Sequence, residues 1–133
     1  MDTRLKKLFN SERLRSTSVT AQDRVNYNDE RNDYESDLGR ALFSSAARRL
    51  HDKTQVFPLT NDDNIHSRLT HSMEVMNIGA SLAKDICFNK DFQERYGVKD
   101  VYEIYEPLRA ILQTVCLVHD IGNPPFGHFG GET

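Results

Sequence analysis

Apolar residues recur with helical spacing in three stretches of the chain. In the first stretch, from Leu38 to Leu50, they return every four positions, at Leu38, Leu42, Ala46 and Leu50, with Phe43 and Ala47 broadening the stripe. An apolar stripe of this period predicts an amphipathic helix that packs on one side.

The second stretch runs from Arg68 to Phe88 and carries two apolar rows. One row holds Leu69, Met73, Met76, Ala80, Ala83 and Cys87, and the other holds Val75, Ile78, Leu82 and Ile86. A helix that is apolar on two rows is expected to be deeply buried, because each row needs a neighbour to cover it.

The third stretch is predicted to be a helix that opens at Pro107, since proline suits the first helical position. It extends through Val118 until Gly122 and the Pro124-Pro125 pair stop it. Residues 89–106 look like a connector with one short helical turn at 91–96. The stretch 22–37 is almost entirely polar and predicts a long loop, either a solvated surface or a binding element.

No stretch of useful length alternates like a strand, so the sequence predicts an all-α fold, a helical bundle. The expected organisation is a polar N-terminal segment at 1–37, followed at 38–133 by the first part of a larger helical domain. With 133 residues, of which 38% are hydrophobic, the composition is that of one globular unit with a modest core.

Net charge, cysteine positions and the absence of long apolar runs bear on the partner and on the location of the protein. A net charge of −3 provides no basic field of the kind that indicates nucleic-acid binding, but it is compatible with a local basic stripe, so the charge leaves the partner open. Cys87 and Cys116 lie in apolar helical stretches, where packing is a better reading than a disulfide or a metal site. The sequence begins without a secretory signal and contains no apolar run of about 20 residues. We therefore expect a cytoplasmic protein without membrane association.

Two histidines and an aspartate stand at the ends of predicted helices. His71 opens the second helix, and His119 with Asp120 closes the third. His71 shares a helical face with an apolar row, and His119 follows Val115 and Leu112 on what we expect to be the buried side of its helix. The two imidazoles are therefore predicted to point into a common interior.

A buried histidine beside a buried aspartate needs compensation, which a divalent metal provides. Imidazole and carboxylate together suit Mn, Fe, Co, Ni, Zn or Mg. For His71 alone, a hydrogen-bonded core histidine is the better interpretation. The spacing by itself leaves a metal site and a helix C-terminal charge arrangement equally open.

At this point the chain resembles a known family. His71 and His119-Asp120 match the first three members of the H…HD…D signature of HD-domain metal phosphohydrolases. The resemblance is more specific to the deoxyguanosine triphosphate triphosphohydrolases (dGTPases). It rests on the strings FSSAARRL (43–50), KTQVFPL (53–59), HSRLTHS (66–72) and HDIGNPPFGHFG (119–130), and it covers about Leu38 to the C-terminus.

The resemblance implies a role for each matching residue. His71, His119 and Asp120 stand at metal-ligand positions. His128 matches a histidine that acts in acid–base catalysis or positions the nucleophile beside the metal. Substrate-contacting positions are occupied by Arg48 at the approach to the pocket, Gln55 for the nucleoside and Arg68 for phosphate. The planar fork of arginine suits phosphate oxygens. A salt bridge for Arg68 and a loop hydrogen bond for Gln55 are the structural alternatives.

In two places the sequence departs from the family pattern. Glu132, our second catalytic candidate, stands one position later than the family's glutamate. The fourth metal ligand, a distant aspartate, has no counterpart before Thr133, so we expect an incomplete site in a chain that is inactive by itself.

The implied function is metal-dependent hydrolysis of dGTP, or another dNTP, to a deoxynucleoside and triphosphate, with Mg or Mn as the first candidates for the metal. The resemblance also implies a homo-oligomer and possible regulation by nucleotides or single-stranded DNA. Two alternatives stay open: an HD phosphohydrolase that acts on other nucleotides or phosphoesters, and a non-catalytic module for folding or assembly.

Overall fold

The computed structural model describes residues 3–10, 31–53 and 67–123, and the regular elements in these ranges are helices. They are α1 (Thr3–Leu8), α3 (Asp33–Leu42), α4 (Ser45–Arg48), α5 (Arg68–Phe88), α6 (Lys90–Tyr96) and α7 (Tyr102–Val118). Within these ranges no residue belongs to a strand, and a single isolated bridge residue, Ser67, precedes α5. The predicted all-α fold is confirmed.

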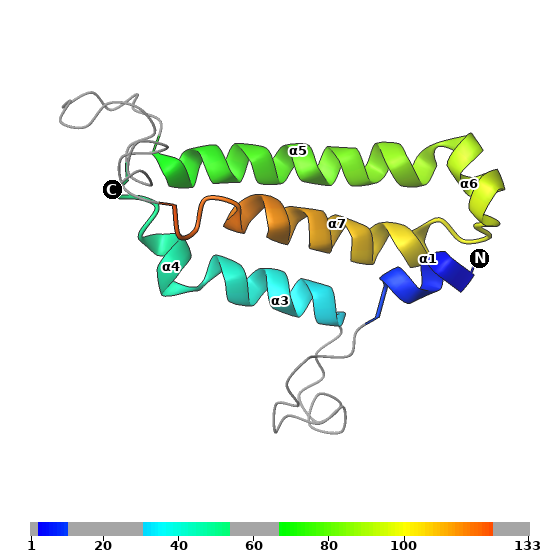
Figure 1. Cartoon of the computed structure of the whole chain (residues 1–133), viewed down its shortest axis with the longest axis horizontal. Coiled ribbons are helices and arrows are strands. Elements are labelled where there is room, and N and C mark those ends of the chain that lie inside the picture. The colour runs from blue at the N-terminus through cyan, green and yellow to red at the C-terminus, as the bar shows by residue number, and fades with distance from the viewer. Residues whose placement is uncertain (1–2, 11–30, 54–66, 124–133) are drawn as a thin grey trace, which may run out of the picture.

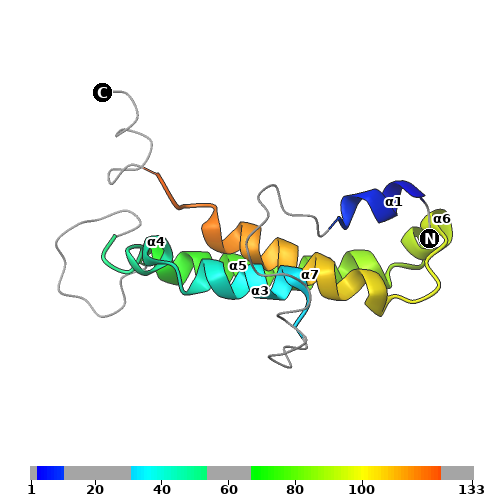
Figure 2. The same cartoon turned by 90° about the horizontal axis from the view of Figure 1, so that it is seen from below.

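The long helices lie side by side in one layer. α7 runs along the middle, antiparallel to α5 on one side, and α3 lies along its other side (Figure 1). The view turned by 90° shows the same layer from below, with α4 near the start of α5 and α6 near its end (Figure 2). The molecule therefore has two distinct ends, which we call the α4 end and the α6 end.

α5 and α7 approach each other closely at a glycine. A Cβ atom added to Gly79 would lie 2.8 Å from the Cys116 Sγ and 3.2 Å from the Leu112 carbonyl oxygen. The other buried residues in the body of α5 are also small, namely Ser72, Ala83 and Cys87. Small side chains on this face let the two helices pack backbone to backbone.

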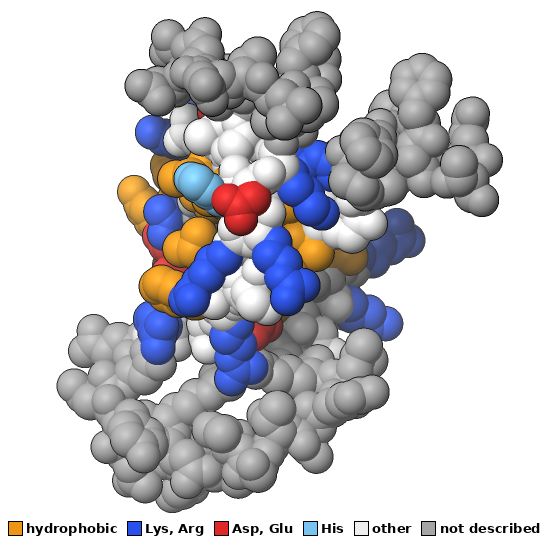
Figure 3. Space-filling model, turned by 90° about the vertical axis from the view of Figure 1, so that its left-hand side faces the viewer, with side chains coloured by type: hydrophobic (Ala, Val, Ile, Leu, Met, Phe, Trp, Pro, Cys, Tyr) orange, Lys and Arg blue, Asp and Glu red, His pale blue; other side chains and the backbone are white. Residues whose placement is uncertain are grey.

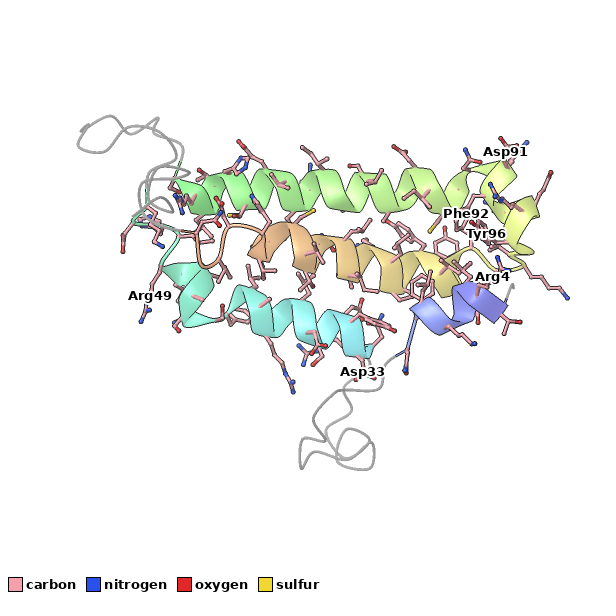
Figure 4. All side chains as sticks on the ribbon, viewed as in Figure 1. Arg4, Asp33, Arg49, Asp91, Phe92 and Tyr96 are labelled. Atoms are coloured by element: carbon pink, nitrogen blue, oxygen red, sulfur yellow. The ribbon has the colours of Figure 1, made fainter. Side chains whose placement is uncertain are left out.

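The α6 end contains an apolar cluster. Leu5, Cys87 and Ile104 are buried there, and partly buried Phe92 and Tyr96 of α6 pack against them. Figure 4 shows these two rings directed from α6 toward the gap between the ends of α5 and α7. Burial raises the pKa of the Cys87 thiol, which agrees with its predicted role as a packing residue.

The predicted helix at 38–50 is wrong in its bounds. α3 already begins at Asp33, inside the stretch expected to be a loop, because Asn32 and Glu35 form a reciprocal capping box. α3 ends at Leu42, and a new helix begins after Ser44, whose side chain accepts a hydrogen bond from the Ala47 amide. The expected boundary between residues 37 and 38 falls inside α3.

The predicted range is confirmed for the second helix, whereas the predicted start of the third helix is wrong. α5 matches the predicted range, and the short turn at 91–96 is α6. α7, however, begins at Tyr102 and carries Pro107 in its interior, so the predicted start was wrong. The helix thus begins five residues earlier than predicted, without a side-chain cap at Val101, and the Asp100 carboxylate accepts a hydrogen bond from the Tyr102 amide at 2.9 Å.

Deep burial of both apolar rows of α5 is also contradicted. Ile78 is 64% exposed and Leu82 is 50% exposed, whereas Ala83 and Cys87 are buried. The physical reason is the single layer, in which α7 covers only one side of α5. None of the helices in the described ranges has the length and apolar character to cross a membrane.

Candidate functional site

The described residues that were predicted to bind metal or substrate lie at the α4 end, where separate segments are joined by main-chain hydrogen bonds. The Arg68 amide donates to the Lys53 carbonyl at 2.8 Å, and the Leu69 amide donates to the Leu50 carbonyl at 3.2 Å. These bonds tie the segment after α4 to the first turn of α5. The last turn of α7 lies beside them (Figure 1).

Local capping sets the start of α5 and with it the position of His71. The Ser67 hydroxyl accepts a hydrogen bond from the Thr70 amide at 3.2 Å, and the Thr70 hydroxyl donates to the Ser67 carbonyl at 2.8 Å. A serine at this position satisfies an amide that the helix leaves without a partner. His71 therefore stands in the first turn, as predicted.

The structure brings His71 and His119 together. Their ring centroids are 5.3 Å apart, and the ring planes are inclined by 71°. The residues are far apart in sequence and come from opposite ends of antiparallel helices, so this proximity depends on the α5–α7 packing. One expectation was wrong: His119 is exposed, as is Val115 one turn before it, because the layer leaves this side of α7 uncovered.

A main-chain hydrogen bond orients the His119 ring. Its Nδ1 lies 2.6 Å from the Cys116 carbonyl oxygen. Because a carbonyl can only accept, Nδ1 carries the proton of the neutral ring, and the lone pair is on Nε2. This tautomer makes Nε2 the ring atom that is able to bind a metal or accept a proton.

Asp120 is buried, with 9% of its surface exposed, directly after the last turn of α7. Its Oδ1 accepts a hydrogen bond of 2.6 Å from the Asn123 side-chain amide. In the described ranges, however, no group of three or more His, Cys, Asp or Glu side chains is arranged to hold a metal ion. The geometry therefore supports a histidine pair, and Asp120 as third ligand stays a prediction.

Arg68 is buried, with 4% of its surface exposed, and one guanidinium nitrogen donates to the Asn123 carbonyl oxygen at 3.3 Å. This contact is a hydrogen bond to the main chain of the turn after α7 and is not itself the salt bridge considered as the structural alternative for this residue. Contact with phosphate stays a prediction.

The other substrate candidates lie partly outside the described residues. Arg48 is exposed on α4 at this end, beside exposed Arg49, which Figure 4 shows pointing away from the helices. Figure 3 looks onto this end and shows several Lys and Arg side chains gathered around a smaller acidic and histidine surface. Gln55, His128 and Glu132 fall outside the ranges that the structure describes.

Sequence reasoning missed two residues at this end. Ser72 is fully buried next to His71, and its hydroxyl has no hydrogen-bond partner among the described residues. Asn123 contacts both Asp120 and Arg68. The sequence feature that could have indicated Asn123 as a site residue is its position directly after Gly122, where a tight turn returns the chain toward Asp120.

Comparison with known proteins adds independent information. The family model of the HD domain matches residues 68–133, a range that begins with α5 and includes both histidines. The deoxyguanosinetriphosphate triphosphohydrolase of Serratia proteamaculans (strain 568) is 48% identical over 97 residues. The enzymes of that name from Salmonella typhimurium (strain LT2) and Yersinia enterocolitica are 48% and 46% identical over 97 residues.

These alignments cover 73% of this chain but only 19% of each of those relatives. The chain thus spans about a fifth of the length of the curated proteins it matches. Proteins with an HD domain are metal-dependent hydrolases, which agrees with the adjacent imidazoles at the α4 end. The chain belongs to the HD-domain family, and within that family it is similar to the deoxyguanosinetriphosphate triphosphohydrolases.

Proposed function

We propose that this chain provides the metal-binding part of an enzyme that hydrolyses dGTP to deoxyguanosine and triphosphate. The observation that carries the proposal is the His71–His119 pair, 5.3 Å apart at one end of the molecule and inside the HD-domain match. The substrate class comes from the relatives, whose name states that they act on deoxyguanosine triphosphate.

The two imidazoles fit a shared metal ion. With a metal–nitrogen bond of about 2.1 Å, imidazoles that bind one ion have ring centres on the order of 5 Å apart. The observed 5.3 Å agrees with this value, and the His119 tautomer leaves Nε2 available. We propose Asp120 as the third ligand and Mg or Mn as the metal, with Co, Ni, Fe and Zn also compatible with this donor set.

When bound, the metal would polarise a phosphate oxygen or activate a water molecule. The residues of the chain would bind and orient the substrate. We assign Arg68 to phosphate and Arg48 to the approach to the pocket, because the cationic end of the molecule to which they belong suits a polyanion. Gln55 is proposed to contact the nucleoside, and His128 and Glu132 are proposed to move protons near the metal.

A second candidate function is assembly without catalysis. It is favoured by the exposed apolar side chains of α5, chiefly Ile78 and Leu82, which a partner would cover. Hydrolysis of other nucleotides or phosphoesters is a third possibility, since the donor set suits them equally. Formation of a homo-oligomer and regulation by nucleotides or single-stranded DNA stay predictions.

The metal site can be tested by Mn²⁺ titration of the protein, followed by electron paramagnetic resonance. We expect His71→Ala and His119→Ala each to weaken binding at least about 10-fold, because each removes one nitrogen ligand. His51→Ala is the matched control: His51 is an exposed histidine paired with Asp52 in the segment that follows α4, and it should bind as the unsubstituted protein does.

The activity is tested by measuring triphosphate release from each dNTP with Mg²⁺ or Mn²⁺. Preferential release from dGTP, lost in His71→Ala and retained in His51→Ala, supports the proposal. Equal Mn²⁺ affinity in all three histidine variants would refute the site. Because the chain by itself is expected to be inactive, the assay is run in parallel on a longer protein that contains it. Metal binding by that longer protein without any triphosphate release would favour the assembly module or another phosphoester.

A further inference from the structure

A tight turn follows α7 and brings Asn123 back to Asp120. The Asn123 amide approaches the Asp120 carbonyl oxygen at 3.4 Å across the turn. Gly122, the third residue of this turn, has φ +95°, a conformation that favours glycine. A β-carbon there would meet no atom within 4 Å, so the need for glycine is conformational rather than steric.

Asn123 contacts two buried charged groups through different atoms. Its side-chain Nδ2 donates to Asp120 Oδ1 at 2.6 Å, and its carbonyl oxygen accepts from the Arg68 guanidinium at 3.3 Å. Arg68 opens α5, and Asp120 follows the end of α7. Asn123 therefore links the starting turn of one helix to the carboxylate that follows the other.

We propose that Asn123 is a positioning residue for the metal site, which acts by holding the Asp120 carboxylate in one orientation. This inference rests on the proposed function, because it takes Asp120 as a metal ligand. Among the described residues Oδ1 is bound by Asn123, and Oδ2 has no recorded hydrogen-bond partner. Oδ2 is thus the oxygen that this inference assigns to the metal, although Asp120, His71 and His119 do not form a three-ligand group in the structure.

The chemistry of the amide suits this role. A neutral donor bound to a carboxylate fixes its rotamer and leaves its full negative charge to attract a cation, whereas a lysine or arginine partner would neutralise that charge. Partners that hydrogen-bond a metal ligand raise metal affinity because they restrict the ligand to its binding orientation. The Asn123 carbonyl oxygen meanwhile accepts a hydrogen bond from the Arg68 guanidinium and so holds that side chain against the turn.

The inference predicts a loss of metal affinity when the amide is removed. We expect Asn123→Ala to weaken Mn²⁺ binding by about 10- to 100-fold, as is typical for residues that support a metal ligand. Asn123→Ser keeps a shorter donor in the turn and should recover part of the affinity. Asn77→Ala, at an exposed asparagine in α5, is the control and should leave the affinity unchanged.

Thermal melting without metal separates positioning from folding. If Asn123→Ala lowers the melting temperature but binds Mn²⁺ with unchanged affinity, Asn123 is merely structural and the inference is wrong. If His71→Ala loses binding while both Asn123 variants keep it, the inference fails and the proposed function stands. If the unsubstituted protein binds no Mn²⁺, both fail. Graded affinity, from the unsubstituted protein through Asn123→Ser to Asn123→Ala, supports the inference when it is measured at a temperature at which all three proteins are folded.

Discussion

The two ends of the α5–α7 pair bury different kinds of side chain. At the α6 end the buried residues are apolar, namely Leu5, Cys87 and Ile104, and aromatic rings surround them. At the α4 end, by contrast, lie all the buried polar or charged residues of the described ranges: Arg68, Ser72 and Asp120. The α6 end therefore has an apolar interior, whereas the α4 end combines buried apolar residues, namely Ala47, Leu50 and Leu117, with buried polar and charged ones.

This difference suggests that the α6 end mainly stabilises the fold, whereas the α4 end carries the candidate functional site. Burial of apolar groups stabilises the fold, whereas a polar group buried without a full set of partners costs roughly 1–3 kcal/mol. A helix pair that contains such groups at one end must be held together by contacts elsewhere. The α6 end and the Gly79 crossing provide them, so the α4 end can carry residues that suit a metal and an anion better than they suit packing.

The largest effect is expected at the apolar end. Ile104→Ala removes a side chain that is 1% exposed and should lower the free energy of unfolding by about 2–5 kcal/mol. Ile78→Ala removes the same group from a position that is 64% exposed and should change it by less than about 0.5 kcal/mol. Urea unfolding followed by circular dichroism measures both. A large loss for Ile78→Ala would show that another surface covers α5 in solution.

An intermediate effect is expected at the crossing that joins the two ends. Gly79→Ala places a methyl group 2.8 Å from the Cys116 Sγ and 3.2 Å from a backbone oxygen, so it should destabilise the protein by about 1–2 kcal/mol despite the better helix propensity of alanine. Gly39→Ala, whose nearest neighbour is the Arg31 side chain at 3.8 Å, should stabilise α3 by about 0.5–1 kcal/mol.

The double variant Gly79→Ala/Cys116→Ala removes the closest contact and should recover part of the loss. Equal stabilisation by Gly79→Ala and Gly39→Ala would mean that α5 and α7 are not in close contact at this point.

The smallest effect is expected at the polar end. Ser72→Ala removes a buried hydroxyl without a partner among the described residues, so stability should be unchanged or rise by up to about 1 kcal/mol. The comparison with Ile104→Ala is then direct, since both residues are almost fully buried. A loss above about 1 kcal/mol, measured by the same urea unfolding, would show that the hydroxyl has a partner and that the two ends are less different than they look.

Local patterns predicted the elements unequally well. The range of α5 followed from its apolar period, and α6 from a short stretch before Gly97. The start of α3 was missed because the Asn32 capping box outweighed the apolar pattern. The start of α7 was missed although no side chain caps it: Pro107 lies inside the helix, and the Tyr102 amide donates to the Asp100 carboxylate before the first turn. The helix at 38–50 was divided because Ser44 caps a new helix.

The sequence by itself determined the helical class, the residue types of the site and their placement at helix ends, because these depend on local periodicity and on motifs that contiguous residues carry. Only the tertiary structure decided that His71 and His119 lie together, since that depends on the antiparallel packing of α5 on α7. It also decided that Ile78 and His119 are exposed and that Asn123 contacts Arg68 and Asp120. Burial and long-range hydrogen bonds depend on which neighbour a face receives, and a periodic pattern specifies the face but not the neighbour.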